Sequence, residues 1–190
     1  MPDVAIVGGG PAGLSAALFT AKNGLETVVF DTDETWMHKA HLFNYPGIRS
    51  ISGSEFMKLT RGQVSDRGAD VRETEEVTDV EATGDGFRVD TEDDSYEADY
   101  VVLATGADRS IAEGLECAFE DDGTVDVDLE METSVENLYA TGAMVRPEEW
   151  QAVIAAGDGA AAALHILSKE KGEHFHDFDV PDDVPGLESE

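Results

Sequence analysis

Three glycines near the start of the chain have the spacing of a site that binds phosphate groups. They form Gly8-x-Gly10-x-x-Gly13, between an apolar run at 4–7 and a segment with helical apolar spacing at 14–22. We expect Gly8 to allow a tight turn, Gly10 to let a pyrophosphate approach the backbone, and Gly13 to let the helix pack against a sheet. The unpaired N–H groups of the helix N-terminus would face the phosphates.

Asp31 stands where such a turn would have an acidic partner. It ends a second apolar run, 27–30, and follows Gly13 by 18 residues (31 − 13), close to the roughly 20 expected. A carboxylate there would accept hydrogen bonds from ribose hydroxyls and repel a 2′-phosphate. A tight turn that binds nothing would explain the glycines alone, but not the acid in register. We therefore predict a dinucleotide site in a βαβ unit, with NAD and FAD both open.

The tetrapeptide Ala-Thr-Gly-Ala occurs twice, at 104–107 and 140–143, each time after a short apolar run. Small residues after a buried strand allow a ligand to come close to the backbone. After the second copy, Pro147-Glu148-Glu149 predicts the start of a small-residue helix over 148–167, because proline and acids favour a first helical turn. We expect the N-terminus of this helix to point at the ligand.

The elements that must hold these segments follow from the pattern around them. Residues 32–50 have weak periodicity and are expected to form a loop, and 54–68 a helix. Uncharged and charged residues alternate at 87–92, between two turns, and this pattern predicts a small antiparallel meander of segments 75–81, 86–92 and 95–98. The fully apolar run 100–103 predicts another strand of a buried parallel sheet. These elements give one domain over 1–176, followed by an acidic tail at 177–190 that is expected to be disordered.

Charge and composition limit the classes of function. The 190 residues include 42 acidic and 12 basic side chains, a net charge of −30, so non-specific binding to nucleic acid or to an anionic membrane is excluded as the main role. The acids are spread along the chain rather than gathered in one segment, which favours the surface of a halophilic protein over an acidic binding module. The chain shows no basic leader and no apolar run of the ~20 residues that cross a membrane, so we expect a cytoplasmic protein.

Longer segments extend the glycine motif to a family. The chain resembles the FAD domain of the thioredoxin reductase family, within the two-dinucleotide-binding flavoproteins. The segments that carry the resemblance follow family order, at 6–17, 44–47, 51–53, 100–107, 133–142 and 151–152. The resemblance implies FAD as the cofactor and a three-layer, Rossmann-like α/β fold. In that fold a central parallel sheet has helices on one side and a small antiparallel β-meander on the other.

The resemblance also implies which residues contact FAD. The pyrophosphate would lie against the turn formed by Gly8, Gly10, Pro11, Ala12 and Gly13. The adenosine side would meet Asp31, the backbone at Val77, and Ala104, Thr105 and Gly106. The ribityl and phosphate region would meet Gly142 and Ala143, and the flavin ring would lie near Asn44, Gln151 and Ala152. Helix N–H groups at Gln151 and Ala152 would face the ring edge where negative charge accumulates on reduction.

Three departures from the family pattern shape the expected function. Only 34 residues separate Gly106 from Thr141 (140 − 107 + 1), too few for the inserted NADPH domain of ~100 residues. The chain has one cysteine, Cys117, and therefore no redox Cys-x-x-Cys, and Ala143 replaces the family's Asp. We expect an FAD oxidoreductase reduced by a separate donor protein or a small-molecule reductant, self-associating as a homodimer. The alternatives are a non-catalytic FAD redox sensor or subunit and, more remotely, an NAD-binding protein.

Cys117 and the histidines are weaker candidates. Acids surround Cys117 and should raise its thiol pKa, so we expect an unreactive loop cysteine. If the loop before Asn44 borders the flavin, His38 or His41 could donate a proton to it. The simpler interpretation of both is an exposed polar loop.

Two further groups of residues have a functional interpretation and a simpler structural one. The segment His174-x-His176-Asp177 has metal-ligating residue types, but it lies near a frayed terminus and is not expected to bind a metal. Trp36 and Trp150 could pack on a flavin, and ordinary packing explains them equally well.

Overall fold

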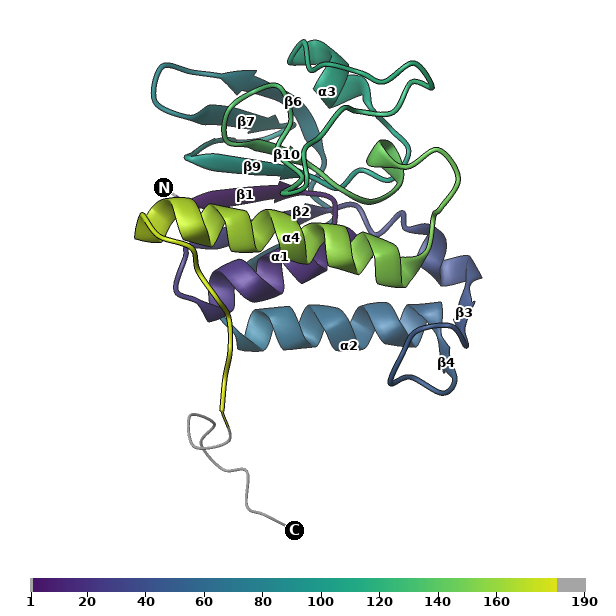
Figure 1. The fold of residues 1–190 in the computed structure, drawn as a ribbon. Coiled ribbons are helices and arrows are strands. Elements are labelled where there is room, and N and C mark those ends of the chain that lie inside the picture. Colours follow the sequence, from purple (N-terminus) through teal and green to yellow (C-terminus); the bar gives the residue numbers. More distant parts are fainter. Residues whose placement is uncertain (1, 181–190) are drawn as a thin grey trace.

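A five-stranded parallel sheet forms the centre of the computed structural model, which describes residues 2–180 (Figure 1). Its strand order is β10-β9-β1-β2-β5, and neighbouring strands are parallel throughout. The strands are β1 (Val4–Val7), β2 (Thr27–Asp31), β5 (Asp70–Glu73), β9 (Tyr100–Leu103) and β10 (Leu138–Ala140). All but the edge strand β5 are buried along their whole length, which explains why their sequences show no polar alternation.

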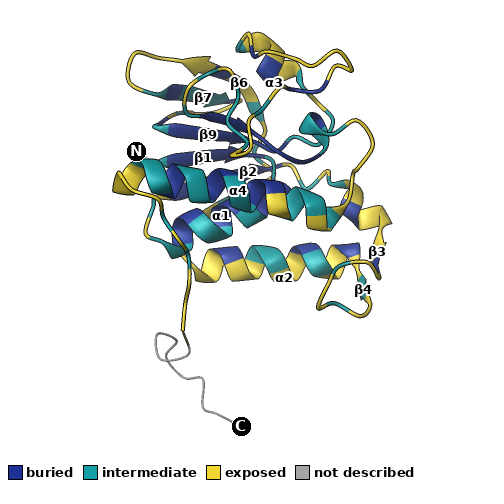
Figure 2. Ribbon diagram, viewed as in Figure 1, coloured by how far each residue is buried: buried dark blue, intermediate teal, exposed yellow. Residues whose placement is uncertain are grey.

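Three helices cover one face of the sheet and a β-meander covers the other (Figures 1 and 2). The helices are α1 (Pro11–Lys22), α2 (Gly53–Asp66) and α4 (Ala152–Lys171). Strand β1 shows how its alternate side chains serve the two layers. Val4 and Ile6 pack with the helices, while Ala5 and Val7 belong to the core on the meander side. This confirms the predicted three-layer α/β architecture.

The meander forms where the alternating segments predicted it, with ends that shift by up to two residues. Its antiparallel strands are β6 (Val77–Ala82), β7 (Phe87–Thr91) and β8 (Ser95–Ala98). The predicted loop at 32–50 is wrong in part, because it holds a 3-10 helix, η1 (Trp36–Lys39), and a strand, β3 (His41–Leu42), that pairs with β4 (Ile51–Ser52). Two short helices were not predicted, α3 (Ser110–Gly114) and the 3-10 helix η2 (Gly142–Val145).

The predicted start of the last helix is also wrong. Helix α4 begins at Ala152 rather than at residue 148, and Gln151 before it has extended backbone angles. The preceding residues form tight local bonds instead of helical ones. The amide of Trp150 donates to the carbonyl of Glu148 (2.8 Å), and the Trp150 indole donates to the carbonyl of Arg146 (2.9 Å).

The chain after α4 passes the end of α1 (Figure 1). Asp177 accepts a hydrogen bond from Lys22 Nζ (2.8 Å) at the end of α1. The predicted disordered tail at 177–190 falls mostly on 181–190, which lie outside the described residues. Within the described part of the chain, no helix combines the length and apolar character needed to cross a membrane.

Candidate functional site

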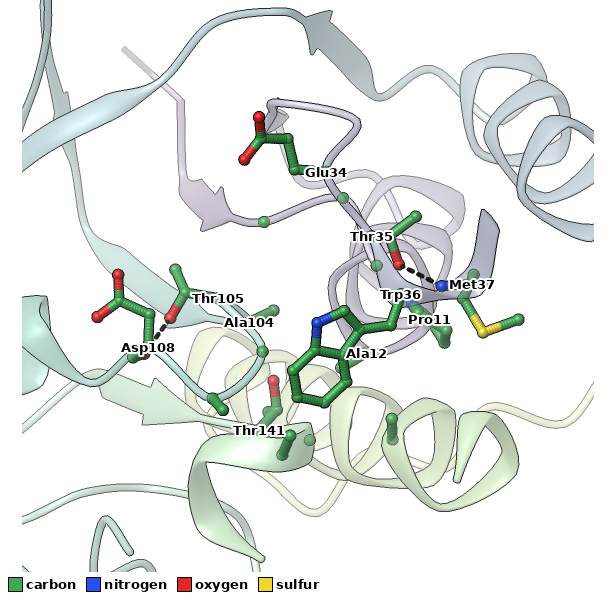
Figure 3. A pocket seen from close by; sticks show the side chains of 18 of the residues that line it. Pro11, Ala12, Glu34, Thr35, Trp36, Met37, Ala104, Thr105, Asp108 and Thr141 are labelled. Carbon is green, nitrogen blue, oxygen red and sulfur yellow. Dashed lines mark hydrogen bonds between the residues drawn. The ribbon is translucent and has the colours of Figure 1, made fainter. Parts of the chain in front are cut away.

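The carboxyl ends of strands β1, β2, β9 and β10 open into a pocket of about 1030 Å³ (Figure 3). This is the edge where open parallel sheets bind ligands. All residues predicted to contact the cofactor line the pocket except Gly13: Gly8, Gly10, Pro11, Ala12, Asp31, Asn44, Val77, Ala104, Thr105, Gly106, Gly142, Ala143, Gln151 and Ala152. The fold therefore gathers segments that lie more than 140 residues apart.

The glycines of the turn between β1 and α1 have different surroundings. A Cβ atom on Gly8, where φ is +110°, would lie 2.3 Å from the carbonyl oxygen of Ala104. A Cβ on Gly13 would lie 1.9 Å from the carbonyl oxygen of Gly8, so this glycine closes the turn from below the pocket. At Gly10 the nearest atom is Thr35 Oγ1 at 4.0 Å, which leaves the open space over the backbone that a phosphate needs.

The two long helices that begin at the pocket have no side-chain cap. Neither α1, which follows Gly10, nor α4, which follows Gln151, has a side-chain hydrogen bond at its N-cap. In contrast, Ser52 caps α2 and Thr35 caps η1. Uncapped first-turn N–H groups and the helix dipole favour an anion at both places.

Charged side chains at the pocket are acidic. Among its lining residues there is no lysine or arginine, while Asp31, Glu34, Glu75, Glu76, Asp108 and Glu149 are present. The backbone amide of Ser110 donates to the Asp108 carboxylate (2.9 Å) and lowers the pKa of that group. Backbone N–H groups and neutral side chains, rather than cations, are therefore the donors that this pocket offers to a diphosphate.

Asp31 is held by partners that the sequence did not indicate. Asp31 is only 3% exposed, and Arg61 of α2 donates from Nε to its Oδ2 (2.8 Å). Nη2 of Arg61 forms an ion pair with the same oxygen (2.7 Å) and donates to Asp33. Oδ1 accepts the amide of Asp33 (2.8 Å). Each carboxylate oxygen has about two acceptor positions, so Oδ1, where the amide of Asp33 takes one, retains capacity for a ribose hydroxyl. Arg61 also offsets the negative charge of the Asp31 carboxylate, which the sequence predicted would repel a 2′-phosphate.

The turn at Gly142 and Ala143 is fixed from two sides. Gly142, at φ +71°, donates its amide to Asp158 Oδ2 (3.3 Å), and Asp158 is buried and ion-paired with Arg146 (2.5 Å). Arg109 donates to the carbonyl oxygens of Met144 (2.9 Å) and Ala143 (3.3 Å). Asp158 lies 16 positions from Gly142, and Arg109 lies 34 positions from Ala143. No local motif in the sequence therefore predicts these contacts.

Two contacts join the segment after β2 to the start of α4 at one end of the pocket. Asn44 Nδ2 donates to Gln151 Oε1 (2.8 Å). The rings of Trp36 and Trp150 lie 5.2 Å apart between centroids, and both line the pocket. Both tryptophans thus belong to the site.

Of the remaining candidate residues, some line the pocket and others lie away from it. His41 lines the pocket, and its Nε2 lies 2.9 Å from Ser50 Oγ. His38 does not line it and instead contacts Ser54 (2.9 Å) and Asp33 (2.8 Å). Cys117 lies outside the pocket, and it is burial, rather than the neighbouring acids, that raises its thiol pKa. No group of three metal-ligating side chains forms within residues 2–180, where Asp177 pairs with Lys22.

Comparison with known proteins places this site in a family. The pyridine nucleotide-disulphide oxidoreductase family matches residues 2–54 and 44–157. Thioredoxin reductase of Treponema pallidum (strain Nichols) is 38% identical over 117 residues, which are 56% of this chain and 36% of that protein. Thioredoxin reductase of Mycolicibacterium smegmatis is 38% identical over 109 residues, 55% of this chain and 35% of that protein. The matches thus span about a third of the length of these relatives.

A solved structure shows the same fold. A thioredoxin reductase from Gloeobacter violaceus superposes with a TM-score of 0.85 at 21% identity, over 94% of this chain and 99% of that one. FAD is the cofactor of this family. The open backbone at Gly10, the two uncapped helices and the small residues after β9 and β10 fit such a ligand. The chain therefore belongs to the pyridine nucleotide-disulphide oxidoreductase family, as an FAD-binding flavoprotein that is similar to thioredoxin reductase.

Proposed function

We propose that this chain is an FAD-dependent oxidoreductase that receives its electrons from a separate donor, either a protein or a small-molecule reductant. When bound, FAD would supply the two-electron chemistry. The chain supplies the pocket, the amide donors and the shape of the entrance. Two features of the chain support electron partners outside it: the first concerns the donor and the second the acceptor.

The first feature is the connection between β9 and β10. It contains 34 residues (137 − 104 + 1), which form α3, a bridge between Phe119 and Val125, and loops. No second glycine turn follows a strand within it. Hydride transfer needs the reacting atoms about 3–3.5 Å apart, and such positioning supplies much of the rate. A connection of this size offers no second dinucleotide fold to hold a nicotinamide.

The second feature is the position of the one cysteine. Cys117 is buried, its Sγ lies 3.8 Å from Thr133 Oγ1, and it does not line the pocket. A lone buried thiol cannot cycle between dithiol and disulfide within the chain. An electron acceptor would therefore have to come to the pocket.

Anaerobic reduction of the FAD-loaded protein tests this proposal. Mixed with excess NADPH or NADH, the protein should keep its visible flavin absorption band, whereas reduced ferredoxin or a small dithiol should bleach it. Dithionite serves as the control for a reducible flavin. Rapid bleaching by either nicotinamide would contradict the need for a separate donor. Bleaching by dithionite alone would favour the non-catalytic sensor or subunit.

A further inference from the structure

The two tryptophans at the pocket are unusually open to solvent. Trp36 is 53% exposed and Trp150 is 46% exposed, although tryptophan is highly buried on average. Both line the pocket together with Asn44 and Gln151, whose hydrogen bond joins the segment after β2 to the start of α4. An exposed aromatic surface inside a ligand pocket is a surface that the ligand can cover.

The two indoles are held differently. The Trp150 indole N–H donates to the carbonyl of Arg146 (2.9 Å), which fixes that ring. The Trp36 indole makes no hydrogen bond within the described residues, and Figure 3 shows it extending from η1 into the pocket. Its backbone is nevertheless firmly placed, because Thr35 caps η1 and a Cβ on Gly53 would lie 1.7 Å from the carbonyl oxygen of Met37.

We propose that Trp36 stacks against the isoalloxazine ring of bound FAD and that Trp150 supports it from behind. Stacked carbon atoms lie about 3.5–4.0 Å apart. The 5.2 Å between the two indole centroids leaves no room for a third ring between them, so the flavin would lie against the part of the Trp36 ring that faces away from Trp150. The proposal rests on FAD binding in this pocket and is independent of the electron donor.

The opposite role for Trp36 would be a plug that FAD has to displace. The two roles predict changes of opposite sign. Removing a stacking partner weakens FAD binding, whereas removing a plug strengthens it. The affinity of a Trp36 variant therefore decides between the two.

Equilibrium dialysis and flavin emission of the full chain test the stacking. Trp36→Leu should bind FAD roughly ten-fold more weakly. The flavin that it does bind should be several-fold brighter, because contact with an indole quenches flavin emission. Trp36→Phe should retain affinity within about three-fold and still be brighter, since phenylalanine stacks but does not quench. Phe43→Leu is the matched control, because Phe43 is 71% exposed in the same segment but does not line the pocket. It should change neither quantity.

The outcomes separate the stacking from the cofactor assignment. Tighter binding by Trp36→Leu would show a plug and overturn the proposal, as would unchanged affinity and emission in both Trp36 variants. If Trp36→Leu fails to fold, the emission of Trp36→Phe decides. Wild-type protein that takes up no FAD would overturn the cofactor assignment and the stacking with it.

Discussion

At Gly10 a side chain would meet open space, whereas at Gly9 it would meet another residue. A Cβ on Gly9 would lie 2.2 Å from Asp31 Cγ, while at Gly10 only Thr35 Oγ1 comes within 4.0 Å. The two adjacent glycines therefore serve different purposes. Gly9 lets β2 end close beside the turn, and Gly10 leaves room for the ligand.

Alanine substitutions should separate these purposes. Gly10→Ala should fold with nearly unchanged stability but bind FAD at least about ten-fold more weakly, because its methyl group occupies the approach to the pyrophosphate. Gly9→Ala should lower the free energy of unfolding by about 1–3 kcal/mol, since Asp31 must move. Denaturant unfolding and FAD titration of both variants provide the measurement. A Gly10→Ala protein with wild-type affinity would contradict this division.

At this scale the sequence revealed the residues that belong to one motif of known spacing. The spacing of Gly8, Gly10 and Asp31 predicted a tight turn, open space for a pyrophosphate over the backbone, and an acidic side chain, all at one pocket. It could not reveal Arg61 or Asp158, because each bonds a residue that only the tertiary fold brings near. Neither contact belongs to a motif of fixed spacing like the one that links Gly13 to Asp31 across 18 positions.

Helices α1 and α4 cross at a point made of small residues. A Cβ on Gly159 would lie 2.0 Å from the carbonyl oxygen of Ala12, and Ala16, Ala162 and Ala163 are buried in the same core. Because both helices begin at the pocket, this crossing sets the distance between the two uncapped N-termini. A larger residue at the crossing would move one N-terminus relative to the other.

Gly159→Ala should therefore destabilise the protein by about 1–3 kcal/mol and weaken FAD binding, because the helices must separate. Gly157→Ala is the matched control in the same helix, where nothing lies within 4 Å of the added Cβ. It should stabilise the protein by up to about 1 kcal/mol through higher helix propensity. Urea unfolding of both variants gives the two free energies. Equal destabilisation of both variants would show that the contact between residue 159 and Ala12 does not account for the lost free energy of unfolding.

Element boundaries followed local signals except where side chains from other segments intervened. The start of α4 shifted to Ala152 because the Trp150 indole bonds the carbonyl of Arg146, while Trp150 also packs on Trp36 from η1. Proline and two acids usually favour a helix start, yet that preference is worth less than these contacts. The meander was predicted within two residues because its alternation and turns are local.

The whole molecule carries far more negative charge than its basic side chains can neutralise. Its net charge is −30. The ion pairs of the described residues engage six lysine and arginine side chains, namely Lys22, Arg61, Arg72, Arg88, Arg146 and Lys169. The surplus carboxylates repel one another in the compact state more than in the unfolded chain.

Stability should therefore rise with salt. The Debye length falls from about 10 Å at 0.1 M to about 3 Å at 1 M, which removes repulsion between carboxylates on different elements. If screening restores about 3 kcal/mol, the melting temperature should rise by roughly 6–12 °C between 0.1 and 2 M potassium chloride. A thermal melt series measures this. Sucrose at matched osmolality is the control, because it stabilises by exclusion from the surface without screening charge. A flat series in potassium chloride, or an equal gain in sucrose, would show that charge repulsion does not limit this fold and that its acidic surface is not an adaptation to high salt.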